Sequence, residues 1–573
     1  METKYADKPL SYHVFLLPFY CKGSTLKPSL GEDWLMDTLS DTDISSEKEE
    51  RKLDYATAQY FTPEARKLLF NSKSSFMYRM DDKNRFYEII KDGVKYRLYV
   101  NKITVTVFDN YIGVLTLHTE FRLKYQDKSL WDILKKSDGA ESVLDNSRLL
   151  KAIREINEYG RRINLPYLGT LEPLKAGEDY GYFHSLVADS LSFFGETEDY
   201  IKLSKELYLN VGNHPMVGYI TKPIKRLLDS LFGRSDLMPV IDDRMFVCCL
   251  VDNPELSRSI KEASMDSRLK IDGSASAENT NREQGVIKSI YSDSKLSDTI
   301  YALGFIDKEK ASCNLEMREN ILRRCVYNRW QGEGTIDIVT HHSFIRILGN
   351  APDYVINPFI TQYVYLATGA LMQRAEILWL SNKSAELSRE YFNEYDDPQN
   401  SDNMIIRKKL TELKRRYVYA QNNIFLNQLT VQEQGVEEFD MLKRELYIDD
   451  SLEKLDRTVN CIYDFTTEFA EEEESRFLSA ITMIGLPFAL IQLFSLCLSF
   501  SFFSGKSSWL PALFLGIVSA GSIIVSWFGL KHYDKYYLKS DKKKIVNKLV
   551  IGICAVIGVL CAIGFVIILC KQP

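Results

Sequence analysis

Three long segments without charged residues, near the end of the 573-residue chain, constrain its fold most strongly. Residues 477–505, 507–530 and 549–570 contain no Asp, Glu, Lys or Arg over 29, 24 and 22 residues. A helix needs about 20 apolar residues to cross the hydrocarbon core of a bilayer. We therefore predict a transmembrane domain at 477–573 with helices at about 477–503, 508–530 and 546–570, which excludes a soluble enzyme, a secreted protein and a fibrous rod.

The charge distribution predicts the orientation of these helices. Residues after 476 contain nine Lys and two Asp, so the net charge of −6 for the whole chain leaves −13 on residues 1–476. Seven of these lysines, from Lys531 to Lys548, lie between the second and third segments, and the positive-inside rule places them in the cytoplasm. The first eight residues lack the apolar core of a signal peptide, so we expect a cytoplasmic N-terminal domain. Its acidity argues against direct nucleic-acid binding.

The predicted fold is an α+β cytoplasmic domain, a long helical stalk and an α-helical transmembrane domain. The first domain covers residues 1–345 as one or two lobes, with a mobile Ser/Ala/Asn/Gly-rich loop at about 271–284. It begins with an antiparallel meander that turns at Asp92–Gly93, and Met245–Val251 is a further strand. The stalk covers 346–476, where we expect Gly435 and Asp449–Asp450 to interrupt the helices.

The first predicted transmembrane helix carries polar and small residues on one face. Such a face must contact protein or water rather than lipid. It lines a pore if several copies surround an axis, or else packs tightly against another helix. The residues at this helical spacing are Thr482, Gly485, Ala489, Gln492, Ser495 and Ser499.

A run of glutamates precedes this helix. In a single chain it would be an ordinary solvated turn, whereas in a ring of subunits it would form a negative vestibule that concentrates cations. Its members are Glu468, Glu471, Glu472, Glu473 and Glu474.

Two adjacent arginines, Arg161 and Arg162, follow a predicted helix at Leu149–Tyr159. Paired guanidinium groups can bind a phosphate in bidentate fashion. The alternative is a pair of exposed charges that favour the helix C-terminus, and replacing exposed arginines should leave the fold intact.

No pattern in the sequence supports catalysis. The pair His341–His342 has no further His or Cys at metal-ligand spacing, so we predict neither a metal site nor a cofactor. There is no phosphate-binding Gly loop and no Ser/His/Asp signature. We therefore predict no catalytic residue and no enzyme activity.

The segment Phe477–Leu490, in which Thr482 precedes Leu486–Pro487, resembles the start of the pore helix of the CorA family of cation channels. Two features depart from that family. Its Gly-Met-Asn signature is absent, because the corresponding place reads Ser499–Gly505. The family has two membrane helices, whereas this chain has three apolar segments. These departures argue against the first alternative function, a constitutive divalent-cation transporter.

Residues 153–163, Trp330 with Gly334–Thr335, Ser343 and 371–374 are similar to a divergent bacterial subgroup of CorA-like proteins. Some members are antiviral effectors of type III CRISPR systems, gated by SAM-AMP, a conjugate of S-adenosylmethionine and AMP. The resemblance implies a channel in the bacterial inner membrane, a homo-oligomer, by analogy a pentamer, in the lipid bilayer. SAM-AMP would be its regulatory ligand, bound by Arg161, Arg162 and Asp229. The second alternative is a membrane-anchored enzyme acting on a nucleotide.

Overall fold

The computed structural model describes residues from 8 to 464, with breaks at 22–25, 27, 30–32, 37–55, 71–74, 81–84, 109–110, 136–143, 163–187, 201, 203–219, 234–235, 242–243, 272–289, 292, 308–312, 351 and 397–402. The chain divides into two compact units. The first comprises residues 1–380 and 418–454, and the second comprises residues 381–417 and 455–573.

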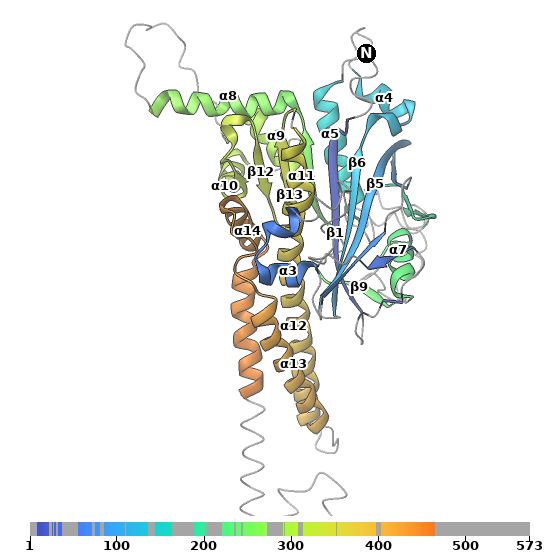
Figure 1. Cartoon of the computed structure of the whole chain (residues 1–573), viewed down its shortest axis with the longest axis vertical. Helices are drawn as coiled ribbons and strands as arrows, with labels where there is room; N and C mark the ends of the chain where they lie inside the picture. Colours follow the sequence, from blue (N-terminus) through green and yellow to red (C-terminus); the bar gives the residue numbers. More distant parts are fainter. Residues whose placement is uncertain are drawn as a thin grey trace, which may run out of the picture. The chain divides into compact units, whose positions relative to one another are not determined.

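A mixed sheet of thirteen strands forms the centre of the first unit (Figure 1). Ten of the strands run in the order β11-β12-β13-β10-β1-β6-β5-β4-β7-β8, β3 pairs with β5 and β2, and β9 pairs with β1. The strands are β1 (Ser11–Cys21), β2 (Leu35–Met36), β3 (Ser75–Met80), β4 (Phe86–Lys91), β5 (Val94–Phe108), β6 (Ile112–Phe121), β7 (Ser190–Phe193), β8 (Glu196–Asp199), β9 (Leu237–Pro239), β10 (Phe246–Asp252), β11 (Val326–Tyr327), β12 (Ile336–Val339) and β13 (Ser343–Leu348).

Strand β1 joins two parts of the sheet that are distant in sequence. It pairs antiparallel with β6 and with β10, with Phe15 opposite Leu117 on one side and Val247 on the other. β10 in turn pairs parallel with β13. Every residue of β10 and of β13 is buried, as expected for strands covered on both faces.

Helices α5 (Asn146–Gly160) and α7 (Lys222–Phe232) cover one face of the sheet. The first helix starts where the Asp145 carboxylate accepts a hydrogen bond from the backbone N–H of Arg148, an ordinary N-cap. The second ends at Gly233, whose φ of 60° closes the helix in the left-handed conformation. Both pack on alternate residues of β1, since Gly160 lies against Phe15 and the ring of Phe232 is 5.7 Å from that of Phe19.

Other helices cover the opposite face. Phe344 and Ile345 are successive strand residues and therefore point to opposite faces. The ring of Phe344 lies 5.5 Å from that of Phe359 in η3 (Phe359–Tyr363), a single π-helical turn. The ring of Tyr365 packs against that of Phe70, with 4.8 Å between the two ring centres. The helices here are α3 (Pro63–Phe70), α11 (Asp353–Pro358) and the start of α12 (Val364–Asp396).

The structure describes further helices in both units. They are η1 (Leu123–Tyr125), α4 (Lys128–Leu134), α8 (Pro254–Ile271), α9 (Ser294–Phe305), α10 (Leu315–Cys325), η2 (Gln331–Glu333), α13 (Asn403–Asn423) and α14 (Glu433–Glu445), followed by helical residues 448–464. Within the second unit, the Tyr417 hydroxyl donates to Asp456 at 2.6 Å and Lys409 pairs with Glu390 at 2.9 Å.

The structure confirms the predicted meander. Strands β4 and β5 meet at Asp92–Gly93, with φ of 50° and 76°, and β10 falls where Met245–Val251 was predicted. The predicted interruption lies earlier than Gly435: the chain leaves the helix between Asn423, the end of α13, and Glu433, the start of α14, so that Gly435 falls in the first turn of α14. A Cβ at Gly435 would overlap the Tyr60 hydroxyl, so its small size serves close packing. The predicted loop at about 271–284 lies outside the described residues, apart from Ile271 at the end of α8.

The predicted fold class is wrong in its C-terminal part. Among the described residues, no helix is both long enough and apolar enough to cross a bilayer. α13, for example, has 21 residues and is long enough, but charged residues such as Lys408, Lys409 and Lys414 recur along it, so it is too polar to cross. We therefore do not retain the transmembrane domain, the inner-membrane location or the ion channel. The segments predicted to span, 477–503, 508–530 and 546–570, lie outside the described residues.

Candidate ligand-binding site

The C-terminal end of α5 holds the two predicted ligand-binding arginines in buried positions. Arg161 and Arg162 expose only 4% and 5% of their surface, so they are not the exposed charges that the sequence had suggested. The Tyr87 hydroxyl donates to the Gly160 carbonyl at 2.6 Å, and the Met245 N–H donates to the Arg161 carbonyl at 2.6 Å. These bonds tie the helix end to β4 on one side and to the residue before β10 on the other.

A third arginine and a histidine join this helix end. Arg162 forms an isolated antiparallel bridge with Arg244, which places the two backbones side by side. His342, on the turn between β12 and β13, accepts at its carbonyl from the N–H of Val247 at 3.1 Å. Its ring Nε2 lies 3.1 Å from the Phe305 carbonyl, which can only accept, so Nε2 carries the hydrogen. We call these residues, Arg161, Arg162, Arg244 and His342, the arginine cluster.

The electrostatics of the arginine cluster favour an anion. Burial, and to a smaller extent the positive charges of Arg161 and Arg244, lower the pKa of His342 to about 3. The imidazole is therefore neutral at physiological pH, because a fourth positive charge is unfavourable here. Negative charge brought by a ligand would act in the opposite direction and would be stabilised by the same groups.

The structure does not bring Asp229, the third predicted ligand residue, into contact with the arginine cluster among the residues it describes. Asp229 lies on α7, within electrostatic range of Lys225 and Arg226. Burial raises the pKa of Asp229 above its ordinary value, against the opposing effect of these two cations. Its Oδ1 is buried without a hydrogen-bond partner in the described part of the chain.

A cavity of about 560 Å³ lies at the end of the sheet formed by β4, β7 and β8, and the sequence did not predict it. Aromatic, basic, acidic and hydroxyl side chains surround it, from three segments between residues 85 and 226. The lining residues are Arg85, Phe86, Glu88, Ser192, Phe193, Phe194, Gly195, Glu196, Thr197 and Arg226. The only local signal was an Arg–Phe pair before one strand and a Phe–Phe–Gly turn after another, and neither has a known spacing rule. We call this the edge cavity.

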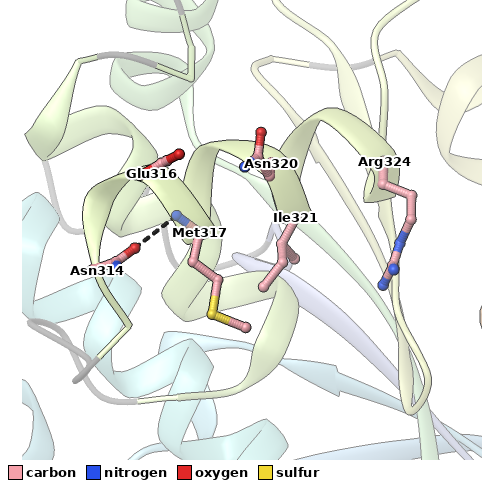
Figure 2. Close-up of a pocket in the computed structure, with 6 residues that line it drawn as sticks. All are labelled: Asn314, Glu316, Met317, Asn320, Ile321 and Arg324. Carbon is pink, nitrogen blue, oxygen red and sulfur yellow. Dashed lines mark hydrogen bonds between the residues drawn. The ribbon is translucent and has the colours of Figure 1, made fainter.

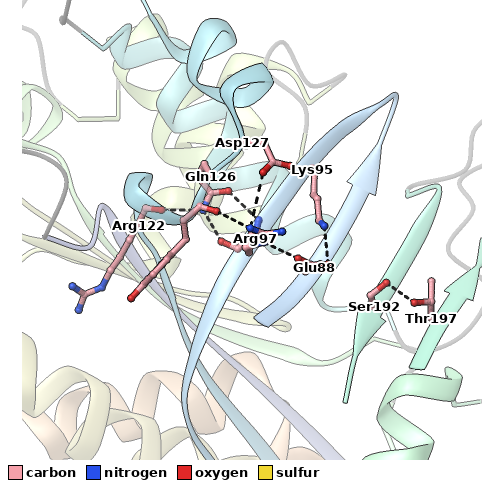
Figure 3. A network of polar contacts seen from close by, with 9 residues as sticks. Glu88, Lys95, Arg97, Arg122, Gln126, Asp127, Ser192 and Thr197 are labelled. Atoms are coloured by element: carbon pink, nitrogen blue, oxygen red, sulfur yellow. Dashed lines mark hydrogen bonds and ion pairs between the residues drawn. The ribbon is translucent and has the colours of Figure 1, made fainter. Parts of the chain in front are cut away.

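Ion pairs fix the part of the sheet beside the edge cavity (Figure 3). Glu88 accepts from Arg97 Nε at 2.7 Å and pairs with Lys95 Nζ at 2.9 Å. Partial burial raises the pKa of Glu88, but these two cations outweigh it and the pKa lies below its ordinary value. Gln126 adds a bond from its Nε2 to the Arg97 carbonyl at 2.6 Å. The Glu88 carboxylate is therefore ionised and held in one orientation where it lines the cavity.

In two further hollows, some of the lining side chains already form hydrogen bonds or ion pairs. One of about 340 Å³ runs along α10, where the Asn314 side chain accepts from the N–H of Met317 at 2.7 Å (Figure 2). Arg324, which also lines this hollow, pairs with Glu445. The other, of about 430 Å³, lies where Arg329 binds both Glu433 and Glu437 at 2.8 Å. We assign no ligand to either.

The remaining site predictions receive no structural account. The pore-lining residues Thr482 to Ser499 and the acidic residues Glu468 to Glu474 lie outside the described residues. Comparison with family models, with curated proteins and with solved structures found no match to this chain.

Proposed function

We propose that this protein is a sensor that binds a phosphate-bearing, nucleotide-like second messenger through the arginine cluster. The observation that carries the proposal is the convergence of Arg161, Arg162 and Arg244 at one buried helix end, beside a neutral His342. Guanidinium groups present planar forks of N–H donors that match phosphate oxygens. SAM-AMP, which the sequence resemblance implies, is the first ligand to test, and antiviral signalling is the corresponding biological role.

The position of the arginine cluster supports a role in signalling. Its members come from the end of α5, the residues just before β10 and the β12–β13 turn, which are three segments that are far apart in the sequence. A ligand that bridges them would change the relative stability of their arrangements, which is how binding shifts a conformational equilibrium. His341, next to His342, also contacts α14, since its Nδ1 donates to the Glu445 carbonyl at 3.0 Å.

Calorimetry with SAM-AMP on the full chain tests the proposal. Each charge-assisted hydrogen bond contributes roughly 1.5–3 kcal/mol, so Arg161→Ala with Arg162→Ala should weaken binding by about two to four orders of magnitude. Because both side chains are buried, the charge-preserving Arg161→Lys with Arg162→Lys is needed as well. It should retain the fold and bind with intermediate affinity, since a Lys keeps the charge but loses the fork.

Lys151→Ala is the matched control, because Lys151 is an exposed cation on the same helix. It should bind as tightly as the wild type. Equal affinity in the wild type and in a folded Arg161→Lys, Arg162→Lys variant would assign these arginines a structural role. A wild type that does not bind SAM-AMP would exclude this ligand.

A further inference from the structure

We propose that the edge cavity is a second binding site, for a nucleoside monophosphate. The proposal uses residues other than those of the arginine cluster and does not depend on the function proposed above. A volume of about 560 Å³ is within the range of small-ligand pockets, which runs from about 300 to 1,000 Å³. Its walls carry the three kinds of group that such a ligand needs: a flat cationic surface, a cation and an acceptor.

The flat surface is the guanidinium group of Arg85. Its central carbon lies 4.2 Å from the centre of the Phe194 ring, so the ring supports the guanidinium group from one side. Nucleic-acid bases stack on arginine planes as well as on aromatic rings. A base in the edge cavity would continue the stack of Phe194 and Arg85.

The backbone at Phe194 indicates that this ring has a specific role. Phe194 and Gly195 form the two-residue turn between β7 and β8, with φ of 53° and 76°. The same turn between β4 and β5 uses Asp92 and Gly93, with φ of 50° and 76°, and Asp is among the residues that tolerate this conformation best. A bulky Phe here is strained, and such strain collects at ligand-binding sites.

The cation is Arg226, on α7, and the acceptor is Glu196, which directly follows the turn at the start of β8. Both line the cavity, and neither forms a hydrogen bond or ion pair with any residue that the structure describes. Arg226, on the exposed side of α7, can bind a phosphate through its fork of donors. Glu196 can accept hydrogen bonds from a base amino group or from ribose hydroxyls.

Equilibrium binding to the full chain tests the proposal with AMP, GMP, CMP and UMP, and with two fragments. The fragments are adenosine, which lacks the phosphate, and ribose 5-phosphate, which lacks the base. At least one monophosphate should bind the wild type, and both fragments should bind about ten-fold more weakly or worse, since each loses one of the two interactions.

Variants then separate the two interactions. Arg226→Ala should weaken binding of the monophosphate by about ten-fold or more and leave adenosine unchanged, because only the phosphate contact is lost. Lys225→Ala, which removes the neighbouring cation on the same helix, should have no effect, since Lys225 does not line the cavity. Arg85→Lys keeps the positive charge but loses the planar guanidinium group. It should therefore weaken the binding of adenosine and leave the binding of ribose 5-phosphate unchanged.

Glu196→Gln provides a fourth variant if Arg85→Lys does not fold. It should also weaken the binding of adenosine. The proposal is overturned if no monophosphate binds the wild type, if Arg226→Ala binds as the wild type does, or if ribose 5-phosphate binds as tightly as the nucleotide. The Arg161→Lys, Arg162→Lys variant should keep monophosphate binding here while losing affinity for SAM-AMP. Failure of one proposal is therefore distinguishable from failure of the other.

Discussion

The guanidinium group of Arg346 forms a bidentate ion pair with the carboxylate of Asp337, with Nε–Oδ1 and Nη2–Oδ2 distances of 2.5 and 2.8 Å. The two residues face each other on β13 and β12, and both are buried. Glu438 of α14 binds the same guanidinium group at 3.1 Å, and Tyr363 lies beneath it with its ring centre at 4.3 Å. One cation therefore joins the sheet to α14 and to η3.

Replacing this cation should strongly destabilise the first unit. Arg346→Met leaves Asp337 as a buried charge without compensation, which costs about 3–5 kcal/mol in free energy of unfolding. Arg323→Met is the control, because Arg323 is 55% exposed and pairs with Glu319 on the surface of α10. It should cost less than about 1 kcal/mol in denaturant unfolding. Similar costs for both variants would contradict this account.

Glu438 should behave as a neutral acid rather than as a second anion. Burial, together with the neighbouring Asp337, raises its pKa well above the ordinary 4.5, against the opposing charge of Arg346. Its contribution to stability is therefore present below pH 4.5 and is lost as pH rises through the folded-state value. Glu438→Gln should flatten this decline between about pH 5 and 8. Asp337→Asn should destabilise far more at neutral pH, and equal losses from the two variants would refute the assignment.

Gly435→Ala should destabilise the protein although alanine is the better helix former. The intrinsic gain is about 1 kcal/mol. At this position, however, a Cβ would overlap the Tyr60 hydroxyl and would lie 2.6 Å from Thr430 Cγ2. We expect a net loss of about 1–3 kcal/mol, measured by thermal or denaturant unfolding. Adding Tyr60→Phe, which removes the overlapping oxygen, should recover part of that loss.

His13 should make stability fall in mild acid. Burial lowers its pKa to about 4, against the hydrogen bond that its Nδ1–H donates to Asn157 Oδ1 at 2.6 Å. In the unfolded chain the pKa is near 6.5, so unfolding takes up a proton between these values. Stability should therefore fall as pH drops from 6.5 to 4, by roughly 3 kcal/mol in total.

Denaturant unfolding of two histidine variants at pH 7.5, 6 and 5 measures the contribution of His13 to the pH dependence of stability. His13→Gln should be less stable than the wild type at pH 7.5, because the buried hydrogen bonds change, but it should show a shallower decline with acidity. His341→Gln, at an exposed position on the β12–β13 turn, should keep the wild-type slope. An unchanged slope in His13→Gln would show that other groups take up the protons.

Local patterns in the sequence were sufficient to identify individual elements. The dipeptide Asp92–Gly93 specifies a two-residue turn because both residues tolerate positive φ, and the flanking alternation of apolar residues gives β4 and β5. The apolar run Met245–Val251 predicted β10 for the same reason: strand periodicity and turn chemistry depend only on neighbours in sequence. Arg161 and Arg162 were recognisable as a pair at a helix end.

Only the tertiary structure decided how these elements meet. Pairing of β1 with β10 joins residues more than 200 positions apart, and nothing local in either strand specifies its partner. Burial converted the arginine pair from surface charges into part of a cluster with Arg244 and His342, because desolvation depends on whatever the fold places around a group. Gly435 likewise follows its contact with Tyr60 rather than its low helix propensity, since packing at close range outweighs an intrinsic preference of about 1 kcal/mol.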